Sequence, residues 1–203
     1  MTRTARCTAR RTAWLAAALY GAALLTGCGA SKEAPPPSGP ATNFALTDHN
    51  GHPFELSSLR GKTVMLFFGY STCPDVCPTT LSKLVRVSRL LGADSARVTT
   101  LYVTVDPERD TPEVLKADLG LFRLDALGLT GSRAEVDKVV AQYGVKYEIV
   151  PTPQSAGKYT VSHSTTLYVL DANGALQRSF PYEATADEIV TGVKEVIAGG
   201  GPP

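Results

Sequence analysis

Cysteine is scarce in this chain of 203 residues, which contains only four: Cys7, Cys28, Cys73 and Cys77. A domain stapled by disulfides needs cysteines that can join distant parts of the fold. The last two lie four residues apart, so they cannot do this. Their chemistry is therefore local, and it predicts either a redox pair or a metal site.

The chain also lacks an excess of charge of either sign, since 20 basic and 19 acidic side chains give a formal net charge of +1. Nucleic-acid binding depends on a basic surface, so this composition gives no support for a nucleic-acid partner. A hydrophobic content of 43% is ordinary for a globular protein. The length and composition therefore fit one compact domain with a core, plus additional segments.

No hydrophobic run is long enough for a comfortable membrane span, because the apolar stretch at residues 13–25 is too short. Arginines precede it, which is typical of a signal peptide, here residues 1–27. The run ends in Leu25-Thr26-Gly27-Cys28, which resembles a bacterial lipobox and predicts a lipid on Cys28. A plain signal peptide with an incidental cysteine is the alternative. Lipidation would place the chain outside the cytoplasm, anchored to a bacterial membrane and facing the periplasm or the cell exterior.

The mature chain divides into three parts. Residues 28–42 contain the lipidated cysteine and are rich in Pro, Gly and Ser, a composition that cannot bury a core and predicts a flexible tether. Residues 43–198 carry the hydrophobic patterns of a single domain. We expect a disordered tail at residues 199–203.

The first half of the domain predicts a hairpin followed by a strand–helix–strand unit. Asn50-Gly51 between two short apolar segments is a hairpin signal. Residues 63–69 form a continuous apolar run that fits a buried strand, and residues 78–91 have apolar side chains at helical spacing. Residues 98–105 are again rich in β-formers. This order predicts parallel, central strands.

Capping signals mark three further helix starts: Thr111 before Pro112, Ser132 with Glu135, and Thr185 with Glu188. Residues 144–150, 165–170 and 175–180 are expected to be strands, the last two joined as an antiparallel hairpin. A strand–helix–strand unit followed by a hairpin and a C-terminal helix is the thioredoxin order. The predicted fold class is therefore α/β, thioredoxin-like, with a mixed central sheet, flanking helices and an N-terminal β-hairpin.

Cys73 and Cys77 lie between the buried strand and the amphipathic helix, where open α/β sheets place ligand sites. Cys77 falls at the helix N-terminus, where free N–H groups favour an anion, so we expect its thiolate to be accessible near neutral pH. Thioredoxin-type redox pairs have two intervening residues, and here there are three. The spacing therefore favours a metal site over a redox pair without excluding the pair.

His163 is the candidate third ligand, because it precedes a strand expected next to the cysteine strand, where thioredoxins have a cis-proline. A solvated loop residue or a satisfied core group is an equal alternative from position alone. Two thiolates and one imidazole form a soft set that suits Cu(I), and Cu(II) with another ligand. His49 and His52 lie in the hairpin turn and its flank, and they are expected to have no ligand role.

Three motifs together carry a family resemblance: FFGYSTCPDVCPTTL at 67–81, VTVDPERDTP at 103–112 and VSHSTTLYVLDANG at 161–174. In this order they resemble the Sco/SenC family of copper chaperones over roughly residues 43–198. The resemblance implies a thioredoxin-like fold and copper ligands at Cys73, Cys77 and His163. Many members have an acidic residue directly before the histidine; Ser162 occupies that position here, which predicts a weaker hold on Cu(II).

The resemblance also implies a function, the delivery of copper to the CuA centre of cytochrome c oxidase. Its partners would be the CuA-bearing subunit, a periplasmic copper donor and a thiol reductant. The alternative is a thiol–disulfide reductase in which Cys73 and Cys77 alternate between dithiol and disulfide, and a peroxiredoxin-like peroxidase ranks below it. Asp106 and Arg109 follow the second central strand and are expected either to form part of a docking surface or to be a solvated turn.

Overall fold

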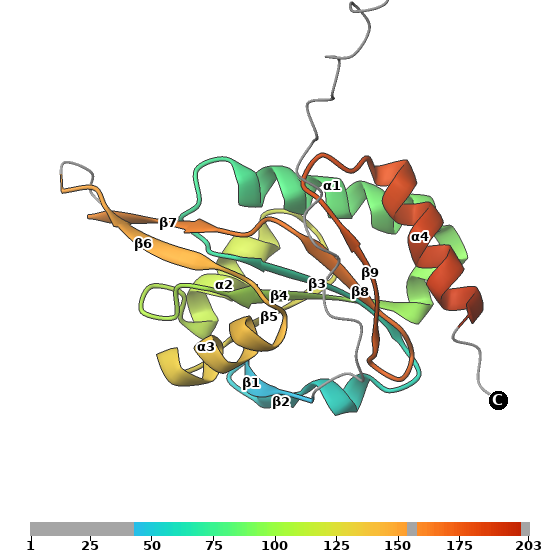
Figure 1. Cartoon of the computed structure of the whole chain (residues 1–203), viewed down its shortest axis with the longest axis horizontal. Helices are drawn as coiled ribbons and strands as arrows, with labels where there is room; N and C mark the ends of the chain where they lie inside the picture. Colours follow the sequence, from blue (N-terminus) through green and yellow to red (C-terminus); the bar gives the residue numbers. More distant parts are fainter. Residues whose placement is uncertain (1–42, 154–157, 200–203) are drawn as a thin grey trace, which may run out of the picture. The chain divides into compact units, whose positions relative to one another are not determined.

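A mixed sheet of seven strands lies at the centre of the computed structural model, which describes residues 43–153 and 158–199 (Figure 1). Its strands are β1 (Ala45–Asp48), β2 (Pro53–Glu55), β3 (Thr63–Gly69), β4 (Val98–Thr104), β5 (Ala126–Thr130), β8 (Leu167–Leu170) and β9 (Leu176–Phe180). Their order across the sheet is β2-β1-β5-β4-β3-β8-β9. A separate two-stranded sheet consists of β6 (Tyr147–Pro151) and β7 (Tyr159–His163).

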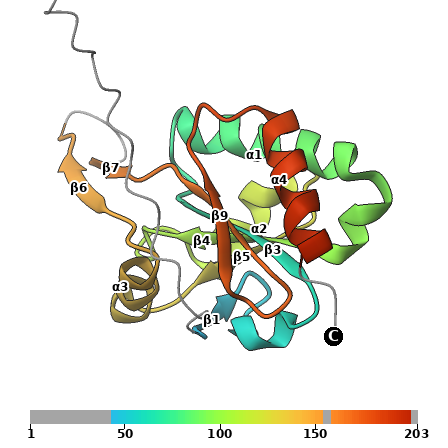
Figure 2. The same ribbon diagram turned by 45° about the vertical axis from the view of Figure 1, so that its right-hand side comes forward.

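Four α-helices accompany these strands in the described part of the chain: α1 (Val76–Leu91), α2 (Pro112–Gly120), α3 (Arg133–Gln142) and α4 (Ala186–Gly199). Two short 3-10 helices, η1 (Leu56–Leu59) and η2 (Gly92–Arg97), lie between strands. Helices α1 and α4 pack against each other on one side of the sheet (Figures 1 and 2). None of the helices in these residues is both long and apolar enough to cross a bilayer.

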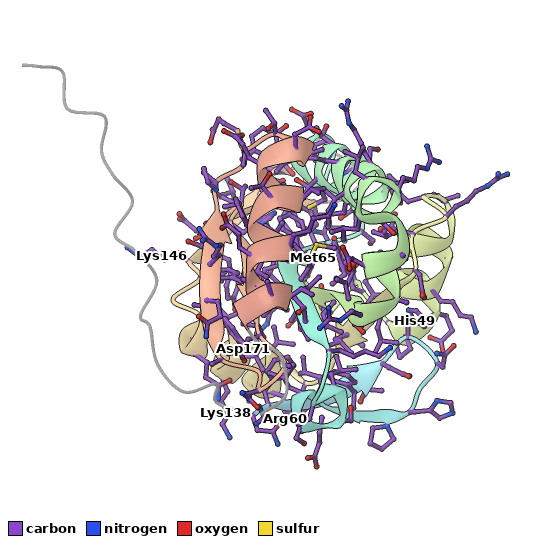
Figure 3. The ribbon with its side chains drawn as sticks, turned by 90° about the vertical axis from the view of Figure 1, so that its right-hand side faces the viewer. His49, Arg60, Met65, Lys138, Lys146 and Asp171 are labelled. Carbon is purple, nitrogen blue, oxygen red and sulfur yellow. The ribbon has the colours of Figure 1, made fainter. Side chains whose placement is uncertain are left out.

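The central strand–helix–strand unit forms as the sequence predicts. Every residue of β3 is buried, because the strand has neighbours on both edges and packed layers on both faces. β3 and β4 pair in parallel from Thr63 opposite Val98 to Gly69 opposite Thr104. Seen from the α4 side, Met65 of β3 lies inside the molecule, whereas Arg60 and Lys138 lie at its periphery (Figure 3). β3 therefore delivers its carboxyl end, Gly69, from the middle of the core.

The predicted capping residues form the expected helix starts. The Thr111 hydroxyl accepts a hydrogen bond from the backbone N–H of Val114, and Pro112 is the first residue of α2. Ser132 forms a full capping box with Glu135. Thr185 and Glu188 exchange the same pair of bonds before α4. These contacts satisfy N–H groups that a helix leaves unpaired, so the helices begin where the sequence predicts.

Two strands are absent from the sequence prediction. β5 has the sequence ALGLT, in which alanine and glycine weaken the β signal, and it becomes a strand by pairing with β4 and β1. β7 ends at His163, in a stretch for which the sequence predicts no strand. The predicted strand at residues 144–150 exists as β6, but it pairs with β7 outside the central sheet. The prediction that β8 neighbours β3 is confirmed.

The structure gives a thioredoxin-like α/β fold with a mixed sheet, flanking helices and the N-terminal hairpin of β1 and β2. The predictions for the signal peptide, for Cys28 and for the tether lie outside the described residues. The same holds for the predicted tail, apart from Gly199, which closes α4.

Candidate metal centre

The loop between β3 and α1 brings Cys73 and Cys77 together. β3 ends at Gly69, and the Cys73 backbone N–H donates to the Tyr70 carbonyl at 3.2 Å, which turns the chain back. α1 begins at Val76, so Cys77 lies in its first turn. The Cys77 backbone N–H then donates to the Cys73 sulfur at 3.4 Å. The predicted folding back of Cys73 toward Cys77 is thus present in the structure.

The two cysteines differ in their surroundings. Cys77 is 2% exposed and belongs to the hydrophobic core, whereas Cys73 is half-buried at the edge of that core. Burial denies a thiolate its hydration and therefore disfavours ionisation of the enclosed thiol. The pair therefore offers one enclosed sulfur and one that solvent or a partner can reach.

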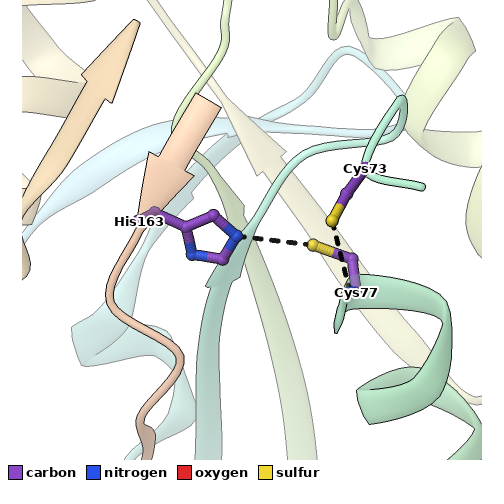
Figure 4. A group of neighbouring side chains, drawn as sticks. All are labelled: Cys73, Cys77 and His163. Atoms are coloured by element: carbon purple, nitrogen blue, oxygen red, sulfur yellow. Dashed lines mark hydrogen bonds between the residues drawn. The ribbon is translucent and has the colours of Figure 1, made fainter. Parts of the chain in front are cut away.

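His163 approaches the sulfurs from the end of β7 (Figure 4). Its Nε2 lies 3.6 Å from the Cys77 sulfur, and its Nδ1 lies 2.8 Å from the backbone carbonyl oxygen of Ser164. A carbonyl oxygen only accepts hydrogen bonds, so in the neutral ring Nδ1 carries the proton and donates to it. Nε2 then has a free lone pair. The ring also packs edge-on against Phe67 and Tyr70. The Ser164 carbonyl therefore fixes the tautomer that a metal ligand requires.

Ser162 does not orient this ring. Neighbouring residues of a strand point to opposite faces, and Ser162 is exposed whereas His163 is half-buried. In the β6–β7 sheet, Ser162 pairs with Glu148.

The three donor atoms satisfy the geometry of a small metal site. The two sulfurs and the imidazole nitrogen all lie within 4.8 Å of one another. Bonds from a d10 ion to nitrogen and sulfur are about 2.0 to 2.3 Å long, so three donors in a plane around it are separated by roughly 3.5 to 4 Å. The Cys77–His163 separation of 3.6 Å falls in this range. The residues fit a three-coordinate soft ion with little movement.

The ionisation of the thiols differs from the sequence prediction. A hydrogen bond from the Cys77 thiol is the largest of the interactions that lower the pKa of Cys73 to about 3, and burial opposes this change. The thiolate of Cys73 and burial raise the pKa of Cys77. Cys73 therefore ionises first, and the expectation of an accessible Cys77 thiolate is wrong. The helix-start N–H of Cys77 points to the Cys73 sulfur rather than to its own.

Asp110 anchors the cysteine loop, a role that sequence reasoning missed. Its fully buried carboxylate accepts hydrogen bonds from the backbone N–H and the hydroxyl of Ser71, and from the Thr104 hydroxyl at 2.6 Å. Burial raises the pKa of Asp110, while these hydrogen bonds oppose the rise. The only sequence signal for this role is its position in the DPERD motif.

Asp106 and Arg109 lie beside the histidine hairpin rather than on an open surface. Asp106 has no exposed area, so the suggestion that its side chain itself contacts a partner is not compatible with its burial. It accepts a hydrogen bond from the Tyr159 hydroxyl at 2.8 Å and pairs with Arg109. The Arg109 guanidinium stacks 3.8 Å from the centre of the Tyr159 ring and keeps a fifth of its side chain exposed. A docking role for Arg109 stays a prediction.

The other two histidines make local contacts away from the sulfurs. His49 accepts a hydrogen bond from the Gly128 backbone N–H at 3.0 Å. The side chain of His52 is 76% exposed and lies 3.7 Å from Asp48. In the described residues, Cys73, Cys77 and His163 form the one group of three metal-binding side chains.

Comparison with known proteins adds independent information on this site. A family model described as SCO1/SenC matches residues 33–198. An SCO2-like protein of Rickettsia prowazekii is 35% identical over 147 residues, which cover 72% of each chain.

Solved structures share the fold. ScoI of Bradyrhizobium japonicum with copper bound superposes with a TM-score of 0.71 at 38% identity, covering 78% of this chain and all of that one. BsSco, described as a member of the Sco family of cytochrome c oxidase assembly proteins with a disulfide switch, gives a TM-score of 0.63 at 25% identity. That match covers 79% of this chain and 95% of BsSco.

Proposed function

This chain belongs to the SCO1/SenC family, and on that premise we propose that it binds one copper ion through Cys73, Cys77 and His163 and passes it to a protein acceptor. The observation that carries the proposal is the convergence of the two sulfurs and the imidazole Nε2 within 4.8 Å. Two thiolates and one imidazole suit Cu(I), whereas a structural zinc site wants a fourth side chain. Cu(II) is held with the help of another ligand.

The different burial of the sulfurs supports transfer by ligand exchange. Cys73 is half-buried, so an incoming donor atom can reach the ion from its side, while Cys77 and His163 keep hold of it. The low pKa of Cys73 keeps that ligand deprotonated at neutral pH. The ion then moves through a shared intermediate and is never released free.

We propose the CuA centre of cytochrome c oxidase as the acceptor. BsSco belongs to a family of cytochrome c oxidase assembly proteins, and this supports the choice. A bacterial lipid anchor on Cys28 would hold the domain outside the cytoplasm at the membrane, beside such an acceptor. A periplasmic copper donor and a thiol reductant would complete the route.

Copper stoichiometry tests the ligand assignment. The full-length chain is loaded with Cu(I) and Cu(II), with His163→Ala as the test variant and His52→Ala as the control, since His52 is exposed and lies outside the site. We expect about one copper per chain for the parent and for the control, and a loss of affinity of at least roughly 100-fold for His163→Ala. Normal binding by His163→Ala would contradict the assignment.

A thiol–disulfide reductase is the second candidate, supported by the adjacent sulfurs and the low pKa of Cys73. The Cys73 thiolate would attack a target disulfide, and the Cys77 thiol, after losing its proton, would displace the target thiol and leave a Cys73–Cys77 disulfide. Turnover of a disulfide substrate should then be the same for His163→Ala as for the parent chain. In a metallochaperone, formation of that disulfide should instead abolish Cu(I) binding, because the thiolates are the ligands.

A further inference from the structure

Tyr102 is a completely buried tyrosine in β4 whose hydroxyl has no hydrogen-bond partner within the described ranges. It lies opposite Phe67 in the parallel pairing of β3 and β4, and the two rings are 6.0 Å apart. Leaving a buried hydroxyl unpaired costs free energy, so such groups are rare in folded proteins and call for an explanation.

The Tyr102 hydroxyl lies next to the sulfur of Cys77. A methyl group built on Gly69 would lie 2.7 Å from the Tyr102 oxygen and 2.9 Å from the Cys77 sulfur. Both atoms therefore border the same small space at the end of β3. Glycine at this position keeps that space free of side-chain atoms, which lets the hydroxyl face the sulfur.

The strength of the Cys77 sulfur as an acceptor depends on whether it binds a metal. A neutral thiol sulfur is a weak acceptor, whereas a thiolate, the form that binds a metal, is a strong one. The Tyr102 hydroxyl borders the same space as this sulfur and can donate a hydrogen bond to it.

We propose that the Tyr102 hydroxyl is a positioning residue that donates a hydrogen bond to the Cys77 sulfur when that sulfur becomes a copper-bound thiolate. The inference rests on the proposed copper site. Cys73 already has a donor in the Cys77 backbone N–H. Tyr102 would supply a side-chain donor to the second, enclosed sulfur.

This hydrogen bond would tune the metal. A donor to a coordinating sulfur withdraws electron density from it, which favours Cu(I) over Cu(II) and moves the sulfur-to-Cu(II) charge-transfer band to higher energy. The hydroxyl is within the core, so water cannot replace it. Tyr102 would thus set the balance between the two oxidation states that the site holds.

The test removes one oxygen atom. Tyr102→Phe and the control Tyr143→Phe are compared with the parent in the full-length chain; Tyr143 is also buried but packs against Phe68, on the other face of β3 from Phe67. For Tyr102→Phe we expect unchanged copper stoichiometry, a charge-transfer band at longer wavelength and a lower Cu(II)/Cu(I) potential. Tyr143→Phe should leave both properties at the parent values.

The melting temperature of the metal-free protein distinguishes a tuning role of the Tyr102 hydroxyl from a structural one. Because the hydroxyl is unpaired without copper, Tyr102→Phe should melt at the same temperature as the parent or higher. Identical bands and potentials in Tyr102→Phe and the parent would overturn the inference, while normal copper binding by the parent would leave the proposed function intact. A parent chain that binds no copper would instead overturn the proposed function, and the inference with it.

The copper–sulfur vibration of the parent chain provides a second check. A hydrogen bond to the sulfur carries an exchangeable proton, so the copper–sulfur stretching frequency should shift in D2O. Part of this shift should disappear in Tyr102→Phe. The absence of any shift in the parent would overturn the inference even if the variant did not fold.

Discussion

The cysteine loop and the histidine hairpin supply ligands to the same site from very different environments. The loop follows β3, whose residues are all buried, and Asp110 holds it through hydrogen bonds from Ser71. The hairpin of β6 and β7 forms its own two-stranded sheet, and four of the five residues of β6 are exposed. The cysteines therefore follow a strand of the core, whereas the imidazole comes from a small separate sheet at the margin of the core.

This contrast suits the proposed function, in which the site binds an ion and then releases it. A ligand on a well-packed element stays in place, while one on a small, partly exposed sheet can move at low cost. The hairpin rests on a few contacts with the core, among them Tyr159 with Asp106 and Thr160 with Tyr70. Three predictions test the contrast, beginning with the largest effect.

Shortening a side chain of the central sheet should destabilise the protein much more than shortening one of the β6–β7 hairpin. Leu66→Ala in β3 removes a side chain with no exposed area and should lower the free energy of unfolding by about 2 to 5 kcal/mol. Ile149→Ala in β6 removes a side chain that is 45% exposed and should change it by less than about 0.5 kcal/mol. Urea denaturation of both metal-free variants measures the difference. Equal losses would mean that the hairpin is packed as firmly as the sheet.

Removing the charge of Asp106 should loosen the histidine side of the site alone. In Asp106→Asn the Tyr159 hydroxyl loses a charged acceptor and Arg109 loses its buried partner. Because β7 carries both Tyr159 and His163, we expect a copper affinity lower by roughly 10-fold, as for other groups that orient a metal ligand. Competition with a Cu(I) chelator measures this change.

The matched control for that experiment is Asp187→Asn, which breaks the exposed pair of Asp187 with Arg86. Exposed pairs contribute little, so its copper affinity should equal that of the parent. An unchanged affinity in Asp106→Asn would show that the hairpin is held in place without Tyr159 and Arg109.

The same contrast explains what could be predicted from the sequence. β3 and the starts of α2, α3 and α4 depend on continuous apolar runs and on caps within four residues, so local patterns predicted them. The approach of Cys73 to Cys77 was predicted from their short spacing. β7 was missed because it pairs with β6 in a separate two-stranded sheet and not within the main sheet.

The features that were not predicted from the sequence depend on contacts between residues far apart in the chain. The Thr160–Tyr70 bond joins residues 90 positions apart, and the contact of Cys77 with His163 spans 86 positions. The approach of Tyr102 to Cys77 depends in addition on the missing side chain of Gly69. The low pKa of Cys73 depends mainly on its contact with the Cys77 thiol and to a smaller extent on the helix-start N–H, and spacing alone does not specify either contact.

The smallest expected effect concerns the anchor of the cysteine loop. Asp110→Asn keeps the size of the side chain and can still accept from the Ser71 N–H and the Thr104 hydroxyl, while its amide donates to the Ser71 hydroxyl. The variant replaces a group that burial makes costly to ionise, since the pKa of Asp110 is raised. We therefore expect the loop to keep its structure and the pH dependence of stability to change.

The direction of that change follows from proton binding. An acid whose pKa is raised in the folded chain binds its proton more tightly there than in the unfolded chain. The stability it contributes is full below the ordinary aspartate range, about pH 4, and is lost as pH rises through the folded value. The parent should therefore lose stability relative to Asp110→Asn as pH rises from 4 to 8. Urea denaturation of both chains across this interval measures it, and an Asn variant that instead loses more stability than the parent would mean that the charged carboxylate holds the loop.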